Sequence, residues 1–242
     1  MSNKAKMSRV TVIQKIIDNK RAKTYLEIGV LAGDAFLRIK IKNKWAVDPH
    51  FIIEPLKKIR YYFKNPFNIF SKYFSMDSDT FFDKKDALLA GCGVDVAFID
   101  GLHTFSQSLK DVENTLKYLN KNGVIVLHDC NPLSEAAATP ARSISEIQKI
   151  TPPGFTGIWN GDVWKTVAYL RATRQDLRIF VLDCDSGLGI ITKGVPENML
   201  NYSAEDVLNL SYHDLSKDRQ SLLNLKDVTY FKEFLNGMKS NL

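Results

Sequence analysis

The chain has few cysteines, no long apolar run and no apolar core near its N-terminus. Its three cysteines, Cys92, Cys130 and Cys184, form no pair motif, and residues 1–20 lack the pattern of a signal peptide. No stretch approaches the length of a membrane-spanning helix. These absences favour a globular protein with reduced thiols, and we expect a cytoplasmic location.

Several sequence motifs for binding nucleotides or nucleic acids are absent as well. The chain has neither the dinucleotide fingerprint G-x-G-x-x-G nor a Y-x-x-x-K pair, which argues against an NAD(P)-dependent oxidoreductase. It also has no Asn/Asp-Pro-Pro-Tyr/Phe motif for the methylation of amino groups, so we expect no nucleic-acid partner.

The composition is that of an ordinary globular protein. The 242 residues are 45% hydrophobic and 25% charged, a length and composition that suit one domain. We expect residues 1–242 to form this single domain. Within it we expect an N-terminal helix in 1–20, helices in 200–242, and insertions on the substrate side at 51–70 and 131–160.

Apolar runs alternate with amphipathic segments, which predicts strands that alternate with helices. Strands are predicted at 24–30, 44–49, 71–78, 94–101 and 123–130, and a hairpin at 178–185 and 188–194. Helices are predicted near Gly33–Asp34 and, with Thr104 as N-cap, at 105–119. The pattern predicts an α/β fold with a seven-stranded, mostly parallel sheet, an antiparallel C-terminal hairpin and helices on both faces.

Two of the predicted strands end in carboxylates. The apolar runs at 96–99 and 124–127 lead to Asp100 and Asp129, with His103 and His128 close by. If these strands are neighbours, the two acids lie side by side, because ligands in open α/β sheets bind at the carboxyl ends of the strands. Such a place suits a divalent cation and an ionisable hydroxyl of a substrate.

The first strand runs into a glycine-containing turn. Gly29 and Gly33 allow a ligand to approach the backbone, although a tight turn without a ligand explains the spacing equally well. Asp48 ends the second strand about 20 residues further on, where an acid can accept hydrogen bonds from ribose hydroxyls. Asp77 and Ser78 follow the third strand and would lie near an adenine, or else cap a helix at 80–89.

Five segments in this order resemble the class I S-adenosylmethionine-dependent methyltransferases. They are EIGVLAGD (27–34), AVDP (46–49), MDSD (76–79), FIDGLH (98–103) and NGVIVLHD (122–129). The resemblance covers roughly residues 20–195 and implies a Rossmann-like fold. It extends to bacterial sugar, antibiotic and polysaccharide O-methyltransferases, including cephalosporin-hydroxylase-like and macrocin-type enzymes. The spacing from Glu27 to Gly33 is also similar to that of the catechol-type enzymes.

The resemblance implies a site for S-adenosylmethionine. Its residues would be Glu27, Gly29 and Gly33 on the methionine and ribose side, Asp48 at the ribose hydroxyls, Asp77 and Ser78 beside the adenine, and Asp100 next to the acceptor. In the catechol-type enzymes an acid after the fourth strand and an Asp-Asn pair after the fifth hold Mg²⁺. Asp100 and Asp129 match the two acids.

The third metal position departs from that pattern, because Cys130 stands where the catechol-type enzymes have asparagine. A thiol is a poor ligand for a hard cation. Asn131, His128 or His103 could complete the shell, and we expect the set Asp100, Asp129 and His128 to hold Mg²⁺ or another divalent metal.

His103 stands three residues after Asp100, where the catechol-type enzymes carry a lysine base. An imidazole with a pKa near 6.5 can take a proton from a hydroxyl at neutral pH. His103 could instead ligate a metal or merely begin a helix. We expect His103, Asp100 and Asp129 to be the catalytic residues.

The resemblance implies an O-methyltransferase that acts on a hydroxyl of a sugar, glycan or natural product, with metal assistance. Trp159, Asp162 and Trp164 would lie on the acceptor side, although core packing for Trp164 and a helix cap for Asp162 are equally compatible with the sequence. An NAD(P)-dependent oxidoreductase and a non-catalytic nucleotide-binding protein are the alternatives. A homo-oligomer is also compatible with the sequence.

Basic residues are concentrated in one segment. Residues 38–72 hold nine Lys or Arg against Asp48 and Glu54, a local charge of +7, whereas the whole chain carries +6. Such a stretch can form a solvated helix face. It can also contact an anionic membrane or a lipid-linked substrate.

Overall fold

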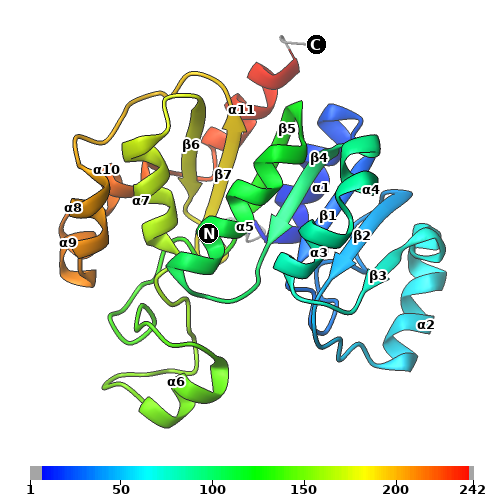
Figure 1. The fold of residues 1–242 in the computed structure, drawn as a ribbon, viewed down its shortest axis with the longest axis horizontal. Coiled ribbons are helices and arrows are strands. Elements are labelled where there is room, and N and C mark those ends of the chain that lie inside the picture. The colour runs from blue at the N-terminus through cyan, green and yellow to red at the C-terminus, as the bar shows by residue number, and fades with distance from the viewer. Residues whose placement is uncertain (1–6, 240–242) are drawn as a thin grey trace, which may run out of the picture.

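The computed structural model of the protein describes residues 7–239 and contains one eight-stranded sheet of order β3-β2-β1-β4-β5-β7-β6-β8 (Figure 1). The strands are β1 Thr24–Ile28, β2 Asn43–Val47, β3 Lys72–Phe74, β4 Val94–Ile99, β5 Leu119–Leu127, β6 Leu177–Leu182, β7 Leu188–Lys193 and β8 Leu225–Lys226. The order reverses between β1 and β4, as expected for a doubly wound α/β sheet.

The predicted mixed sheet is confirmed, but its strand count was wrong. β7 pairs antiparallel with both β5 and β6, and the other pairs are parallel. The eighth strand, β8, has two residues and pairs with the outer edge of β6. It was missed because two residues carry no readable periodicity.

The central strands are apolar because both faces of the sheet are covered. In β4, Ala97 and Ile99 face one core cluster and Val96 and Phe98 face the other. Successive side chains of a strand point to opposite faces, so a continuous apolar run fills both layers.

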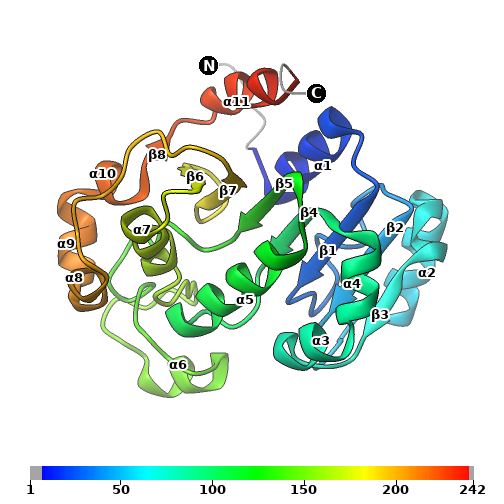
Figure 2. The ribbon, with the colours of Figure 1, turned by 45° about the horizontal axis from the view of Figure 1, so that its top comes forward.

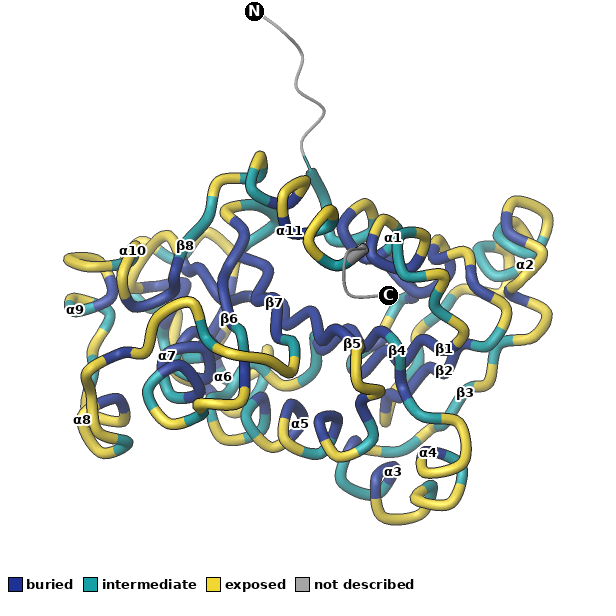
Figure 3. The backbone as a smooth tube through the Cα atoms, turned by 90° about the horizontal axis from the view of Figure 1, so that it is seen from above, coloured by how far each residue is buried: buried dark blue, intermediate teal, exposed yellow. Residues whose placement is uncertain are grey.

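Helices cover both faces of this sheet. They are α1 Arg9–Lys20, α2 Pro55–Lys64, the 3-10 helix η1 Pro66–Phe70, α3 Ser78–Lys84, α4 Asp86–Cys92, α5 Phe105–Tyr118, α6 Ile144–Ile150, α7 Trp164–Thr173, α8 Ala204–Asn209, α9 Tyr212–Lys217, α10 Arg219–Leu223 and α11 Tyr230–Lys239. α1 and α11 lie side by side on one face, and α3, α4 and α5 lie on the other (Figures 2 and 3).

The predicted N-cap of α5, Thr104, is confirmed. Ser143 and Ser203 cap α6 and α8 in the same way. Residues 1–6 of the predicted N-terminal segment and residues 240–242 lie outside the described residues. The single-domain organisation stays a prediction.

The helix predicted near Gly33–Asp34 does not form, and residues 31–38 make irregular turns instead. The buried Lys44 ammonium donates to the carbonyl oxygens of Phe36 and Ile39, each at 2.8 Å. The amide of Asn68 donates to the carbonyl of Leu37 at 3.0 Å. Side chains therefore occupy carbonyls that a helix would pair with its own amides.

Other predicted boundaries shift by a few residues. The helix expected at 80–89 is divided into α3 and α4, and the strand expected at 71–78 has only three residues. β5 begins at Leu119 rather than at Gly123. Within residues 7–239, no helix has both the length and the apolar character needed to cross a membrane.

Candidate active site

A cavity of about 890 Å³ lies at the carboxyl ends of β1, β2, β4 and β5. Nine of the predicted site residues line it: Glu27, Gly29, Asp48, Asp77, Ser78, Asp100, His103, His128 and Asp129. Gly33 was also predicted to line the ligand site, but it does not line this cavity. Its φ of 73° instead gives the left-handed backbone conformation that the turn after β1 needs at this position.

Gly29 is required by a close approach of two backbones. Its φ is 82°, and a Cβ atom there would lie 2.0 Å from the carbonyl oxygen of Asp100. Glycine alone permits the loop after β1 to touch the loop after β4. This contact brings the turn after β1 next to Asp100.

Glu27 lies at the end of β1 with its carboxyl group buried. Burial raises the pKa of Glu27 to about 8, against the opposing effects of a hydrogen bond from Tyr25 and the charge of Lys44. A carboxyl group of this kind is protonated at neutral pH unless a cation comes close to it.

Asp48 holds the turn after β1 in place. Its Oδ2 accepts a hydrogen bond from the amide of Leu31 at 2.7 Å, and its Oδ1 accepts one from the amide of His50 at 2.7 Å. Each oxygen retains a lone pair toward the cavity, because a carboxylate offers about four acceptor sites.

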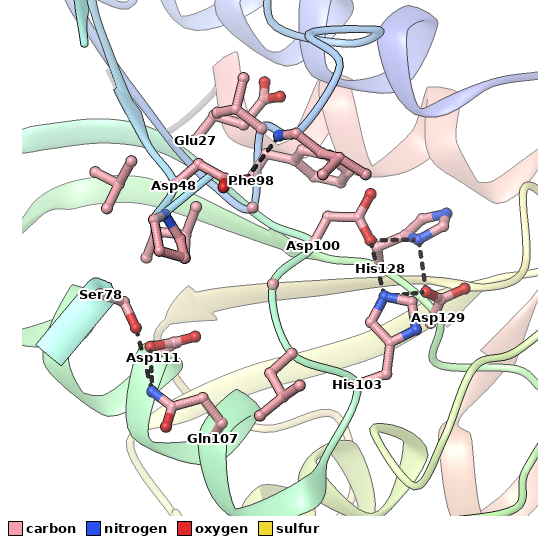
Figure 4. Close-up of a pocket in the computed structure, with 18 of the residues that line it drawn as sticks. Glu27, Asp48, Ser78, Phe98, Asp100, His103, Gln107, Asp111, His128 and Asp129 are labelled. Carbon is pink, nitrogen blue, oxygen red and sulfur yellow. Dashed lines mark hydrogen bonds and ion pairs between the residues drawn. The ribbon is translucent and has the colours of Figure 1, made fainter. Parts of the chain in front are cut away.

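Asp77 caps α3, the alternative that the sequence left open. Its carboxylate accepts hydrogen bonds from the amide and hydroxyl of Thr80 at 2.7 and 2.9 Å. The neighbouring Ser78 instead meets two residues of α5 that the sequence did not single out (Figure 4). The amide of Gln107 donates to Ser78 Oγ at 3.1 Å and to Asp111 Oδ1 at 3.0 Å.

Asp111 is buried at this end of the cavity, and burial raises its pKa to about 6. In the structure it shares the buried face of α5 with Ser108, Val112 and Thr115. In the sequence it lies beside the apolar stripe rather than on it, so no local signal identified Asp111.

Asp100, His103, His128 and Asp129 form one cluster (Figure 4). His103 Nε2 lies 3.2 Å from Asp129 Oδ2 and 3.6 Å from Asp100 Oδ1. His128 Nδ1 lies 3.0 Å from each of the same two carboxylates. The register of β4 with β5 brings the two strand ends together, as the sequence predicted.

Asp129 adopts a left-handed backbone with φ of 60°. This conformation costs roughly 1–2 kcal/mol in a non-glycine residue, and aspartate tolerates it better than most. The amide of Asn160 donates to Asp129 Oδ1 at 2.6 Å. Asn160 was not predicted as a site residue, although it lies in the 159–165 stretch assigned to the acceptor side.

The loop before α7 also holds His103. His103 Nδ1 lies 2.9 Å from the carbonyl oxygen of Trp159, and the two rings are 4.9 Å apart. Asp162 does not cap α7, since its Oδ1 accepts from the amide of Phe105 at the start of α5 at 2.6 Å. Trp164 packs in the core, as the alternative for that residue allowed.

Two further charged residues join the cluster from distant parts of the chain. The guanidinium of Arg9 donates to Asp100 Oδ2 at 2.7 Å and to Asp185 Oδ1 at 3.0 Å. Asp185 Oδ1 also lies 3.6 Å from His128 Nε2. No local pattern marks Arg9 or Asp185, because the contacts span 91 and 176 residues.

Cys130 and Asn131 do not face the cluster. The Cys130 thiol is buried, with its Sγ 3.3 Å from the carbonyl oxygen of Leu127, and burial raises its pKa. Asn131 donates to Asp183 at 3.0 Å and accepts from Arg219 at 2.5 Å. Asn131, His128 and His103 were suggested as replacements for the missing third metal ligand. Of these three, only the two histidines reach Asp100 and Asp129.

Opposite charges within the cluster shift the pKa values of its members. Burial alone would lower the pKa of both His103 and His128, but the neighbouring carboxylates outweigh it and raise both pKa values. Burial alone would raise the pKa of Asp100, yet the charge of His128 and the hydrogen bond from His103 hold it far below its usual range.

Much of this cavity lies in a part of the chain that is similar to a known protein family. Residues 26–130 match the family model of a methyltransferase domain. This part of the chain is therefore similar to a methyltransferase domain. The match runs from β1 to the residue after Asp129 and so includes Gly29, Asp48, Asp100 and His103.

A viral protein is similar to part of this chain. An uncharacterized protein of Acanthamoeba polyphaga mimivirus is 34% identical over 118 residues, 44% of this chain and 51% of that protein. This chain therefore matches about half the length of that relative.

Two solved structures share the fold. A Staphylococcus aureus protein provisionally assigned as a caffeoyl-CoA O-methyltransferase has a TM-score of 0.53 and 18% identity, covering 78% of this chain and 85% of its own. The SAH-bound methyltransferase of Podospora anserina has a TM-score of 0.51 and 16% identity, covering 80% of each chain. At these identities the likeness shows the fold alone.

Proposed function

We propose that the protein is an S-adenosylmethionine-dependent O-methyltransferase. Its acceptor is a hydroxyl group of a sugar, glycan or natural product. The observation that carries the proposal is one cavity that joins the glycine turn and Asp48 to His103 and Asp129. We propose cytoplasmic action, in keeping with the free thiols of Cys92, Cys130 and Cys184.

The cofactor half of the cavity follows from its donors and acceptors. Asp48 is oriented by two backbone amides, so its remaining lone pairs can accept the ribose hydroxyls. Glu27 can bind the amino group of the methionine moiety, and the carbonyl and carboxylate groups of Gln107 and Asp111 suit the adenine amino group. The known structure with bound SAH supports this cofactor for the fold.

The acceptor half would act through His103. In the transfer, the acceptor oxygen forms a bond to the methyl carbon, the sulfur–methyl bond breaks, and S-adenosylhomocysteine leaves. The hydroxyl proton passes to His103 Nε2, and Asp129 stabilises the imidazolium that forms. Trp159 orients the imidazole through its carbonyl oxygen. In-line placement of oxygen and methyl supplies the remaining rate advantage.

A divalent metal is implied by the catechol-type resemblance. Asp100, His103 and Asp129 offer ligand atoms that all lie within 4.8 Å of one another. His128, predicted as a ligand, contacts both carboxylates but lies deeper. Two carboxylates with an imidazole fit a cation such as Mn²⁺ better than Mg²⁺, which prefers oxygen. Such a cation would occupy the His103 imidazole and would activate the acceptor hydroxyl as a Lewis acid in place of the base.

The His103 proposal is tested with radiolabelled S-adenosylmethionine and a panel of saccharide and polyphenol acceptors. His103→Ala is expected to reduce transfer by about 10²–10⁴-fold, the usual contribution of a positioned base. Affinity for S-adenosylhomocysteine, measured by calorimetry, should stay within about threefold. His213→Ala, which changes an exposed histidine on α9, is the control.

Two results would contradict the proposal. Binding of NAD⁺ without binding of S-adenosylhomocysteine would indicate an oxidoreductase. Cofactor binding with full transfer in His103→Ala would remove His103 from the chemistry.

A further inference from the structure

An exposed apolar surface lies outside the active site, on the segment that follows β2. Within α2 and η1, six large apolar side chains are exposed to solvent, with Phe63 85% and Leu56 80% exposed. We call this surface the α2–η1 patch, and its members are Leu56, Ile59, Phe63, Phe67, Ile69 and Phe70. Isolated exposed apolar residues are common, but a contiguous set of this size marks an interaction surface.

Helical geometry places the α2 members of the patch on one face. Leu56, Ile59 and Phe63 recur at i, i+3 and i+7, so they share one face of α2. The opposite face packs on the protein, since Tyr61 bonds Arg38 and the buried Asn65 follows the helix. The apolar stripe therefore points outward and not into the core.

Basic side chains surround the patch. Arg60 and Lys64 flank the apolar stripe on α2, and Lys42 lies 5.1 Å from the ring centre of Phe70. Across residues 38–72, six basic residues are exposed, namely Arg38, Lys40, Lys42, Arg60, Lys64 and Lys72. The only exposed acid of this range is Glu54, because Asp48 is buried at the cavity.

Exposed apolar side chains beside exposed basic side chains favour some classes of partner over others. Protein–protein interfaces are depleted of lysine, whereas amphipathic segments at membrane surfaces are rich in Lys, Arg, Phe and Leu. A symmetric contact between two copies would set Arg60 and Lys64 close to the same residues of the other copy, and like charges oppose it. An anionic lipid surface complements both the charge and the apolar side chains.

We propose that the α2–η1 patch binds the surface of a membrane that contains anionic lipids. The apolar side chains enter the boundary between head groups and acyl chains, and the basic residues contact lipid phosphates. α2 is also joined to the active site, since Lys57 Nζ donates to the carbonyl of Ala32 and to Asp34, which both line the cavity. Docking would therefore bring the cavity close to the bilayer.

The experiment is a vesicle sedimentation assay with the full chain. Vesicles of phosphatidylcholine with 30% phosphatidylglycerol are compared with pure phosphatidylcholine, at about 50 and 300 mM salt. Binding is expected only to the anionic vesicles and should weaken strongly at the higher salt concentration, because the charges are exposed. The assay needs no methyl acceptor, so its result is independent of the proposed function.

Matched variants separate the apolar contribution to vesicle binding from the electrostatic one. Phe63→Gln and Leu56→Gln should each weaken vesicle binding by about 10-fold, the effect of withholding one large apolar side chain from the bilayer. Arg60→Glu with Lys64→Glu should abolish binding at low salt. The controls are Val195→Gln, which is equally exposed elsewhere, and Lys121→Glu with Lys217→Glu, which changes the net charge equally.

Three outcomes would overturn the proposal. Equal binding to neutral and anionic vesicles, or none to either, would exclude an anionic membrane as the partner. A dimer in light scattering that Phe63→Gln converts to a monomer would assign the patch to a second copy of the chain. Thermal unfolding of each variant verifies that the fold is retained.

Discussion

At the scale of single residues, Glu27 shows how burial controls a carboxyl group. Its pKa is raised to about 8 by burial, far above its ordinary value of 4.5. A raised pKa means that Glu27 stabilises the fold fully below pH 4.5, and that this contribution is lost as the pH rises toward 8. The neutral form is thus the form that the apo fold accommodates.

Glu27→Gln is therefore expected to change the pH dependence of stability. Between pH 5 and pH 7, the wild type should lose about 2 kcal/mol of unfolding free energy because of Glu27, and the variant should not. This value follows from about 1.36 kcal/mol per pH unit, reduced because the titration is incomplete at both ends of the range. Urea unfolding at both pH values measures the difference between the proteins. Glu205→Gln on the exposed part of α8 is the control. Parallel curves for wild type and Glu27→Gln would show that the carboxyl group is ionised in the fold.

At the scale of elements, the parts set by local patterns were predictable. The strands of the parallel core, α5 with its Thr104 cap and the β6–β7 hairpin follow from apolar periodicity and turn residues. The meeting of Asp100 with Asp129 followed from topology, because neighbouring parallel strands end at one edge. Arg9, Asp185 and Asn160 could not be located this way, since only the tertiary fold brings them to the cluster.

The irregular segment 31–38 marks the limit of local prediction. Its sequence permits a helix. Instead, the side chains of Lys44 in β2 and Asn68 in η1 donate hydrogen bonds to the carbonyl oxygens of Phe36, Leu37 and Ile39. Lys44 is buried, and burial lowers its pKa to about 7. A lysine in a strand ordinarily points to solvent, so the sequence does not indicate that Lys44 binds these carbonyl groups.

Asn68→Ala should destabilise the protein by about 2–4 kcal/mol. The buried amide of Asn68 serves three groups, the carbonyls of Leu37 and Tyr61 and the ammonium of Lys44, and truncation leaves all three without this partner. Chemical denaturation gives the change in unfolding free energy. Asn122→Ala, at an exposed position, is the control and should change it by less than about 0.5 kcal/mol. A loss of that small size in Asn68→Ala would mean that Asn68 does not hold the segment.

At the scale of the whole molecule, the active site joins the first helix to the last strands of the sheet. Arg9 at the start of α1 bridges Asp100 after β4 to Asp185 in the β6–β7 turn. Its positive charge reaches the same carboxylate that the catechol-type pattern assigns to a metal. Arg9 and a divalent cation would therefore compete for Asp100, because the guanidinium already occupies its Oδ2 and repels a second positive charge placed beside it.

This competition predicts that Arg9→Gln strengthens metal binding. Removal of the guanidinium frees Asp100 Oδ2, and Mn²⁺ affinity, measured by calorimetry with MnCl₂ alone, should rise by about 10-fold, equivalent to ~1.4 kcal/mol. Arg174→Gln removes a comparable arginine–aspartate pair far from the site and should leave the affinity unchanged. The same competition predicts that methyl transfer by the wild type persists in EDTA. If wild type and Arg9→Gln bind Mn²⁺ equally and EDTA abolishes transfer, then Arg9 does not stand in for the cation, and the metal-assisted mechanism is the correct one for this fold.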